Sequence, residues 1–214
     1  MNGGRMPKRS KSTTMEYVEA IVWALVLTLV LRAFVIQAFR IPSESMVPTL
    51  LVGDFLFVNK FEYGPKIPFT HVRLPGLRPP RRGDVIVFQW PVNPSKDFIK
   101  RCIATGGQTL EVAGKNVIVD GDTLREPYAQ HIDPALHPEG YDVRDYFGPL
   151  TVKPGELFMM GDNRDNSNDS RFWGPVQMDL VKGRAMFIYF STAGTNLWDF
   201  LAKIRFERLF QAIH

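Results

Sequence analysis

Asp84-Val85-Ile86-Val87-Phe88-Gln89-Trp90 contains four consecutive apolar residues, and this run is the clearest indication of the fold. A short run of this kind between turn residues is typical of a strand that is buried on both faces of a sheet. The run from Ala185 to Phe190 has the same character, and Val117 to Val119 and Glu156 to Met160 are two further short apolar segments. Because Gly, Pro, Asn and Asp separate these segments, we predict strands joined by turns, and therefore a mostly β fold.

Two regions depart from this strand pattern. The segment 120–149 is polar and holds four prolines and two of the four histidines, so we predict that it forms a smaller inserted β/loop cap on the main β unit. Near the C-terminus, Leu197, Leu201 and Ile204 recur at helical spacing, and the pattern continues loosely to Ile213. This spacing predicts a short terminal helix.

The N-terminal part has the pattern of a membrane anchor. An apolar segment from about Met15 to Phe39 follows a stretch with four basic and no acidic residues, namely Arg5, Lys8, Arg9 and Lys11. The uncharged centre, Ala20 to Leu31, is twelve residues long, whereas a span takes about 20 apolar residues, so Glu19 and Arg32 must lie near the two interfaces. A cleavable signal peptide or a buried helix is the alternative, but no small-x-small cleavage site follows Arg32.

The basic residues before the anchor favour a cytoplasmic N-terminus. We therefore predict a cytoplasmic basic tail (1–14), a single membrane-spanning anchor (15–39) and an extracytoplasmic β-rich domain (40–214). Because Arg32 and Arg40 lie on the other side of the anchor, this orientation is favoured rather than forced.

Composition narrows the function classes. Of the 214 residues 45% are hydrophobic, which is enough for a packed core. The net charge is only +4 and the basic residues are spread along the chain, so nucleic-acid binding has little support, whereas attraction to acidic membrane lipid stays open. The single cysteine, Cys102, excludes an intrachain disulfide and a zinc site of the paired-cysteine type. We predict no metal site and no cofactor.

A candidate nucleophile follows the anchor in the segment Ile41-Pro42-Ser43-Glu44-Ser45-Met46-Val47-Pro48-Thr49-Leu50. Pro42 and Pro48 stiffen the backbone on both sides of Ser45. A serine in a rigid turn has its hydroxyl and amide aimed in fixed directions, as nucleophilic attack and oxyanion binding require. Taken alone, Pro-Ser-x-Ser is more often simple turn chemistry. None of the four histidines lies in a triad context, because they occupy proline-rich loops or the chain end.

A lysine in a predicted strand is the candidate base. In the segment Asp97-Phe98-Ile99-Lys100-Arg101-Cys102-Ile103, Lys100 shares one face with Phe98, while Ile99 and Arg101 point the other way. Burial of the Lys100 face would lower the lysine pKa from about 10.4 by the roughly 2 to 3 units that a base needs. The alternative is an ordinary edge-strand lysine that discourages aggregation.

A third segment is dense in Asp and Asn: Gly161-Asp162-Asn163-Arg164-Asp165-Asn166-Ser167-Asn168-Asp169-Ser170-Arg171-Phe172-Trp173-Gly174. The EF-hand spacing, counted from Asp165, places Ser170 where glycine is needed and Val176 where the bidentate glutamate belongs, so calcium is not predicted. We predict instead a rigid loop in which side chains hydrogen-bond the backbone and Asp pairs with Arg.

Together these segments resemble the type I signal peptidases, the bacterial leader peptidase family. The resemblance covers nearly the whole chain in order: the basic start and anchor, Pro-Ser-x-Ser-Met, Arg82 to Phe88, Phe98 to Arg101, and Gly-Asp-Asn-x-x-Asn-Ser-x-Asp-Ser-Arg. It implies a serine endopeptidase with a Ser/Lys dyad. Such an enzyme removes signal peptides from exported preproteins at the outer, periplasmic face of the cytoplasmic membrane.

The resemblance also implies roles for single residues. By motif match, Ser45 is the nucleophile and Lys100 is the general base that also protonates the leaving amine. The Ser45 amide and the Ser43 hydroxyl bind the oxyanion, and Ser167 hydrogen-bonds and orients Lys100. The supporting residues, of which the last two form an ion pair, are Asp162, Asp169 and Arg171.

The family cuts after small-x-small segments, usually Ala-x-Ala, and this preference is implied for the present chain. The apolar residues that match those beside the catalytic motifs are Ile41, Pro42, Met46, Leu50 and Ile99. Glu44 stands where the family often has glycine. We expect Glu44 to face solvent, because a carboxylate aimed at Lys100 would raise the lysine pKa.

Two alternatives to this function stay open from the sequence. One is a related Ser/Lys peptidase, such as a conjugative-transfer maturation peptidase or a self-cleaving repressor, although a repressor would need a DNA-binding domain in place of the anchor. The other is a membrane-tethered β domain that only binds partners. The order of the motifs along the chain argues against this second alternative.

Overall fold

The structure is a computed structural model, and it describes residues 13–67, 70, 72–194, 199–200 and 203–214. Helices and strands follow one another in the order α1 (Thr13–Phe34), β1 (Ile36–Arg40), β2 (Asp54–Asn59), β3 (Val85–Trp90), β4 (Asn93–Thr105), β5 (Thr109–Ala113), β6 (Asn116–Val119), β7 (Asp122–Thr123), β8 (Tyr146–Thr151), β9 (Glu156–Met160), α2 (Ser170–Trp173), β10 (Val176–Gln177) and β11 (Val181–Ser191). Short 3-10 helices are η1 (Arg164–Asn166), η2 (Met178–Leu180) and η3 (Phe206–Arg208). The predicted mostly β fold is confirmed.

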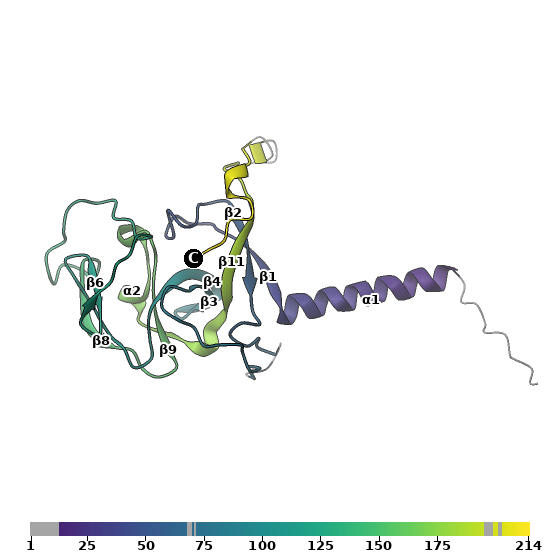
Figure 1. The fold of residues 1–214 in the computed structure, drawn as a ribbon, viewed down its shortest axis with the longest axis horizontal. Helices are drawn as coiled ribbons and strands as arrows, with labels where there is room; N and C mark the ends of the chain where they lie inside the picture. The colour runs from purple at the N-terminus through teal and green to yellow at the C-terminus, as the bar shows by residue number, and fades with distance from the viewer. Residues whose placement is uncertain (1–12, 68–69, 71, 195–198, 201–202) are drawn as a thin grey trace, which may run out of the picture.

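A seven-stranded antiparallel sheet, in the order β1-β2-β11-β3-β4-β9-β10, forms the body of the molecule (Figure 1). Its strand β3 lies between β11 and β4, and the four residues from Val85 to Phe88 are all buried. The unbroken apolar run therefore belongs to a strand covered on both faces, as the sequence predicts.

The second apolar run differs from this expectation. Within Ala185 to Phe190 only Ala185 and Ile188 are buried, because β-bulges interrupt the pairing of β11 with β2 at these points. A bulge adds a residue to one strand and breaks the alternation of faces. Phe187 and Tyr189 are half-buried and pack on Phe57 of β2, with ring centroids 5.5 Å and 4.3 Å apart respectively.

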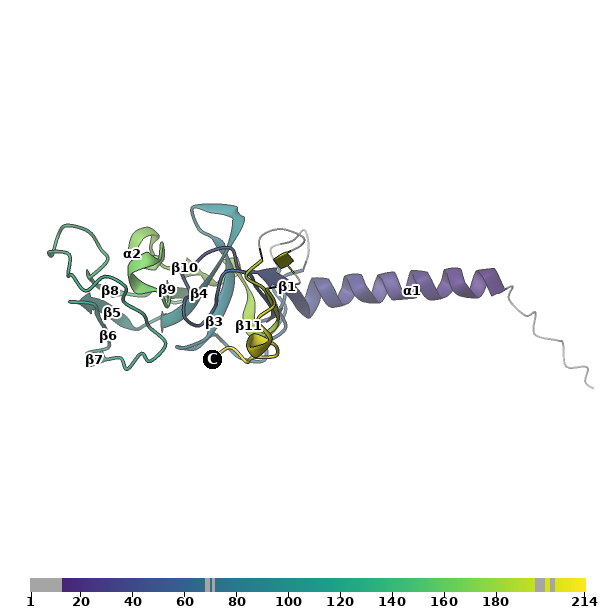
Figure 2. The ribbon, with the colours of Figure 1, turned by 90° about the horizontal axis from the view of Figure 1, so that it is seen from above.

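The inserted cap is a separate four-stranded sheet, in the order β7-β6-β5-β8, at the end of the molecule opposite α1 (Figures 1 and 2). It extends from Thr109 to Thr151, so the predicted cap at 120–149 begins too late. The part of the cap that the prediction leaves out is the β5–β6 hairpin. Alternate side chains of this hairpin pack against side chains of the main sheet and form a second core. Members of this core include Ile103, Leu110, Val112, Val117, Val119, Val152 and Phe158.

Helix α1 projects away from the β domain, and none of its residues is buried (Figures 1 and 2). Its length and composition are sufficient to cross a membrane. The helix ends at Phe34, whereas the predicted anchor runs to residue 39, because Ile36–Arg40 pairs with β2 as an edge strand. Apolar character alone could not separate the two elements. The four basic residues of the predicted tail lie outside the described residues.

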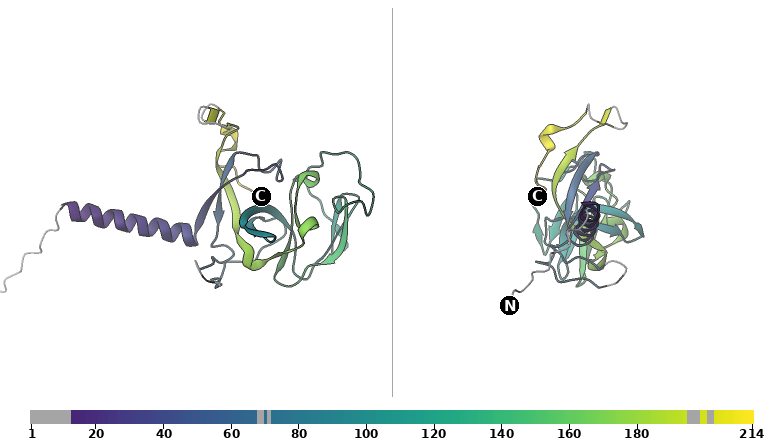
Figure 3. Two further views of the ribbon diagram at one scale, coloured as in Figure 1. Left: turned by 180° about the vertical axis from the view of Figure 1, so that it is seen from behind. Right: turned by 90° about the vertical axis from the view of Figure 1, so that its right-hand side faces the viewer.

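In its described part, the C-terminal segment is helical at Asp199 and Phe200, but the predicted helix does not continue to Ile204 and Ile213. Leu197 and Leu201 lie outside the described residues, but Ile204 forms a β-bridge with Thr192 and Ile213 is buried in the main core. Burial of Ile213 requires an extended chain end that follows β11, and the C-terminus therefore lies beside the main sheet (Figure 3).

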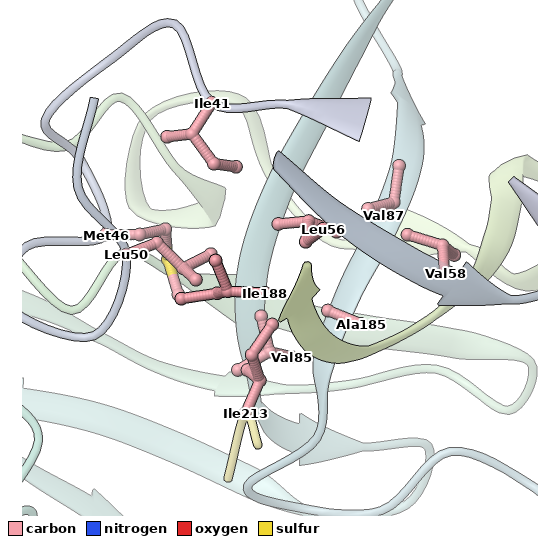
Figure 4. Close-up of a cluster of buried hydrophobic side chains, with 10 residues drawn as sticks. All are labelled: Ile41, Met46, Leu50, Leu56, Val58, Val85, Val87, Ala185, Ile188 and Ile213. Atoms are coloured by element: carbon pink, nitrogen blue, oxygen red, sulfur yellow. The ribbon is translucent and has the colours of Figure 1, made fainter. Parts of the chain in front are cut away.

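The main core fixes the loop that follows β1. Ile41, Met46 and Leu50 from this loop are buried among side chains of β2, β3 and β11 and Ile213 (Figure 4). Met46 and Leu50 are fully buried. The loop is therefore held at both ends and in its middle, and Ser45 immediately precedes one of these three anchor points.

Candidate active site

Ser45 is a nearly buried residue in this anchored loop. It is 8% exposed, and its carbonyl accepts a hydrogen bond of 3.1 Å from the Asn163 amide. Turn hydrogen bonds from Val47 to Glu44 and from Leu50 to Met46 close the backbone around it. The hydroxyl direction is therefore set by the loop.

Lys100 reaches Ser45 from the neighbouring strand β4. Its Nζ donates a hydrogen bond to Ser45 Oγ and lies 5.6 Å from the centre of the Phe98 ring, on the face that the sequence predicts the two residues to share. Opposite Lys100 in the sheet is Ile86 of β3. Two segments 55 residues apart are thus brought into direct contact by the fold.

Burial sets the ionisation of the Lys100 amine. The side chain is 4% exposed, and this desolvation lowers the pKa of Lys100 to about 8. Asp169 and Asp162 act in the opposite direction, whereas Arg171 lowers the lysine pKa further. A neutral amine that accepts a proton is consequently accessible near neutral pH.

Ser43 supplies a second hydroxyl beside the first. Its Oγ lies 3.4 Å from Ser45 Oγ, and Ser43 itself is exposed on the rim of the site. Within the described part of the chain, no acceptor takes a hydrogen bond from the Ser45 amide. One hydroxyl and one amide are therefore available on the open side of the nucleophile.

The loop 161–174 supports Lys100 through a buried ion pair. Asp169 pairs with Arg171 at 2.9 Å and also accepts the Gly161 amide at 3.1 Å. Burial alone would raise the pKa of Asp169, but Arg171 and these hydrogen bonds lower it overall. Arg171 also donates hydrogen bonds to the carbonyls of Arg144 and Arg164, at 2.7 Å and 2.6 Å. Because Arg144 belongs to the cap, the first of these bonds connects the loop to the cap.

Ser167 does not make the expected hydrogen bond. Its Oγ is buried and makes no hydrogen bond to Lys100, but it lies beside the Asp169 carboxylate and helps to lower the pKa of that group. Ser167 packs instead against Gly161. A Cβ at Gly161 would clash with the Ser167 side chain and the Ser45 carbonyl, so only glycine allows the loop to approach the nucleophile this closely.

A second buried ion pair lies on the opposite face of β4. Arg101 Nε and Nη2 donate to the two Asp162 carboxylate oxygens at 2.8 Å and 2.7 Å, and Thr49 donates to Asp162 at 2.5 Å. The Arg101 guanidinium also lies 3.8 Å from the centre of the Tyr128 ring and donates to the carbonyl of His214. The sequence did not predict this role of Arg101. The only indication in the sequence is that an arginine stands next to Lys100 on a predicted strand.

An open cleft of 420 Å³ leads to Ser45 and Lys100. Of the predicted apolar contact residues, Pro42 and Ile99 line it, and Ile41 lines a 30 Å³ pocket that shares Pro42, Phe98 and Ile99 with the cleft. Met46 and Leu50 line neither, because both are core residues. Lining residues that sequence reasoning missed are Asp97, Phe98, Asn166 and Asn168, and Glu44 is exposed at the rim as expected.

The described histidines take no part in this site. His131 lies 3.4 Å from Asp165 of η1, and His137 lies 2.7 Å from Asp142 of the cap. His71 lies outside the described residues. A buried amine bonded to a serine hydroxyl, with further donors beside an open cleft, is an arrangement suited to nucleophilic acyl transfer.

Comparisons with known proteins point to one family. A family model described as signal peptidase, peptidase S26, matches residues 14–190. Signal peptidase I of Pseudomonas aeruginosa is 38% identical over 188 residues, with 78% of this chain and 66% of that protein covered. Signal peptidase I of Leptolyngbya laminosa is 40% identical over 186 residues, with 83% and 80% covered.

Two further matches have similar descriptions. Signal peptidase I of Pseudomonas fluorescens is 34% identical over 206 residues, with 83% of this chain and 72% of that protein covered. A crystal structure of a signal peptidase I from Enterococcus faecalis V583 shares 30% sequence identity, covers 51% of this chain and 98% of its own, and superposes with a TM-score of 0.41.

Burial of the Lys100 amine predicts that Lys100→Met stabilises the protein at neutral pH. The pKa is about 8 in the folded state against an ordinary value of 10.5, so the folded state disfavours the proton by about 3 kcal/mol. Below pH 8 both states are protonated and this cost is complete. Above pH 8 the folded state loses the proton first, so wild-type stability rises and the difference from the variant shrinks.

Urea unfolding of the full chain in detergent micelles, repeated across this pH range, measures the difference. Lys153→Met, at an exposed position, is the matched control and should change stability by less than about 0.5 kcal/mol. A Lys100→Met variant that is less stable than wild type at neutral pH would contradict the assigned burial cost.

Proposed function

The chain belongs to the peptidase S26 family of signal peptidases, and from this premise we propose that it removes signal peptides from exported preproteins with Ser45 as nucleophile and Lys100 as general base. As a family member it is a serine peptidase and a hydrolase. The observation that carries the proposal is the hydrogen bond from Lys100 Nζ to Ser45 Oγ at the inner end of the cleft.

The first chemical step is acylation. Neutral Lys100 takes the proton of the Ser45 hydroxyl while Ser45 Oγ attacks the carbonyl carbon of the peptide bond. The Ser45 amide and the Ser43 hydroxyl stabilise the oxyanion that forms. The resulting Lys100 ammonium then protonates the leaving amine, so the mature protein departs and the signal peptide stays as an ester on Ser45.

The second step is hydrolysis of that ester. Lys100, neutral again after the leaving amine has taken its proton, removes a proton from water, and the hydroxide equivalent attacks the ester carbonyl. The proton on Lys100 then returns to Ser45 Oγ as the signal peptide leaves. Protons balance over the cycle, and Lys100 must lose and regain one proton in each half.

The surrounding ion pairs act by positioning. The ion pairs Asp162–Arg101 and Asp169–Arg171 hold the two sides of the site. The absence of a side chain at Gly161 leaves room for Ser167 and the Ser45 carbonyl. Ser167 takes part in no proton transfer in this proposal, because its hydroxyl has no hydrogen bond to Lys100.

Selection of small residues before the cut follows from the narrow pocket beside the cleft. Its volume of 30 Å³ is small beside the 420 Å³ of the cleft, so it suits a methyl group better than a branched side chain. Ile41, Phe98 and Ile99 form its apolar wall. These dimensions support a preference for Ala-x-Ala.

The placement of α1 supports catalysis at a membrane surface. The helix ends two residues before β1, and β1 leads directly into the Ser45 loop, so an anchored chain would hold the site near the point where a signal peptide leaves the bilayer. The basic residues before the helix favour a cytoplasmic N-terminus, hence a single span with the peptidase domain on the extracytoplasmic side of the cytoplasmic membrane.

We expect Ser45→Ala and Lys100→Ala each to lower the rate of preprotein cleavage in detergent by about 10³-fold or more, since each removes one half of a unit that works together. Ser95→Ala and Lys153→Ala, at exposed positions outside the cleft, are the matched controls and should keep the wild-type rate. Unfolding curves check that all four variants fold. Cleavage by Ser45→Ala at the wild-type rate would contradict the assignment of Ser45 as the nucleophile.

Pocket size predicts the response to a larger substrate residue. Because neither Ser45 nor Lys100 lines this pocket, it suits the alanine of Ala-x-Ala that is farther from the cut. Replacing that alanine by valine should lower kcat/KM by about 10-fold to 100-fold, because overpacking costs about 1–3 kcal/mol. Ile99→Ala enlarges the pocket and should recover part of the loss for the valine substrate. Equal kcat/KM for both substrates with the wild-type enzyme would show that this pocket does not select the residue.

A further inference from the structure

A second polar pocket lies at the end of the main sheet that is joined to α1. Its volume is 180 Å³, and it forms where β1 and β11 begin and where β2 and β3 end. The residues that line it are Gln37, Lys60, Lys66, Gln89, Asp179, Leu180, Val181 and Lys182. It shares no lining residue with the cleft of Ser45.

The charges around this pocket are mainly positive. Three of its lining side chains are lysines, against one acid, Asp179. Burial lowers the pKa of Lys60, and the positive charges of Lys182 and Arg32 lower it further. The positive charge of Lys182 is partly neutralised, since its amine pairs with Asp97 at 2.7 Å. A bound anion would relieve the repulsion among these cations.

The pocket is held in shape by the backbone around it. Arg73 donates to the carbonyls of Gly64, Met178 and Val181 at 2.6 Å, 3.0 Å and 2.7 Å, and so fastens the loop that carries Lys66 to the start of β11. The Lys60 amide donates to the Val35 carbonyl at 2.9 Å. The lysines are therefore presented by fixed elements and not by a free tail.

Its position relative to α1 identifies the source of the anion. Lys60 Nζ donates to the Arg32 carbonyl, at 3.3 Å, in the last turn of α1. The 22-residue helix is about 33 Å long, close to the roughly 30 Å of a bilayer core, so Arg32 lies at the membrane interface if α1 spans. The pocket, which is lined by Gln37 of β1 and by Lys60, then lies at the depth of the lipid headgroups. Figure 2 shows α1 projecting from β1.

We propose that this pocket binds the phosphate of an anionic phospholipid headgroup, with Lys60, Lys66 and Lys182 as its cationic ligands and the Gln37 and Gln89 amides as further hydrogen-bond donors. The inference rests on the membrane span of the proposed function. A lipid bound here would fix the tilt of the β domain on the bilayer, and with it the height of the Ser45 cleft above the membrane.

The test is native mass spectrometry of the full chain in detergent micelles, titrated with phosphatidylglycerol or with zwitterionic phosphatidylcholine. We expect one phosphatidylglycerol to be retained, and Lys60→Gln/Lys66→Gln/Lys182→Gln to weaken this binding about 100-fold. The charge-matched control is Arg82→Gln/Arg125→Gln/Lys153→Gln, which removes three exposed cations away from α1 and should bind like wild type. Retention that is equal in both triple variants would overturn the site.

Further arms separate the other outcomes. Inorganic phosphate in excess should not displace the lipid, and displacement would show a site for free phosphate instead. If the triple variant does not fold by its unfolding curve, Lys66→Gln/Lys182→Gln keeps the Lys60–Arg32 contact and should still weaken binding about tenfold. Ser45→Ala should retain phosphatidylglycerol like wild type, so the lipid site and the proposed peptidase mechanism fail independently.

Discussion

The burial of one amine, Lys100 Nζ, against the hydroxyl of Ser45 is the constraint on which the rest of this structure depends. Water would hold that amine as a cation, and only a dry contact on β4 makes the neutral form accessible near neutral pH. Two segments must therefore meet with little freedom: a strand buried on both faces, and a loop pinned by Ile41, Met46 and Leu50. The packed core is thus a requirement of the chemistry.

The two buried ion pairs solve an electrostatic problem that this arrangement creates. Asp162 and Asp169 both lie close enough to Lys100 to raise its pKa, which opposes its use as a base. Arg101 and Arg171 engage these carboxylates directly and reduce their net field at the amine. The same arginines reach the C-terminal carbonyl and the cap. The cap and the chain end are therefore coupled to the site through charge and hydrogen bonding.

Sequence alone predicts the elements whose signal is local. The apolar runs at Val85 to Phe88 and Glu156 to Met160 are strands, and the shared face of Phe98 and Lys100 follows from strand alternation. Features that depend on tertiary contacts could not be predicted. The change from helix to strand at Val35 lies within one apolar segment, and Met46 and Leu50 fill the core although they adjoin the motif serine. The pairing of Arg101 with Asp162 joins residues 61 positions apart.

The pH dependence of kcat/KM for a preprotein, measured with the full chain in detergent, tests most directly whether a buried neutral lysine is the base. We predict that log kcat/KM rises with unit slope at low pH and levels off above an apparent pKa of about 8, because only the deprotonated Lys100 of the free enzyme accepts the serine proton. A rise that continues to the pKa of an ordinary lysine, about 10.4, or a profile without any such limb, would contradict this assignment.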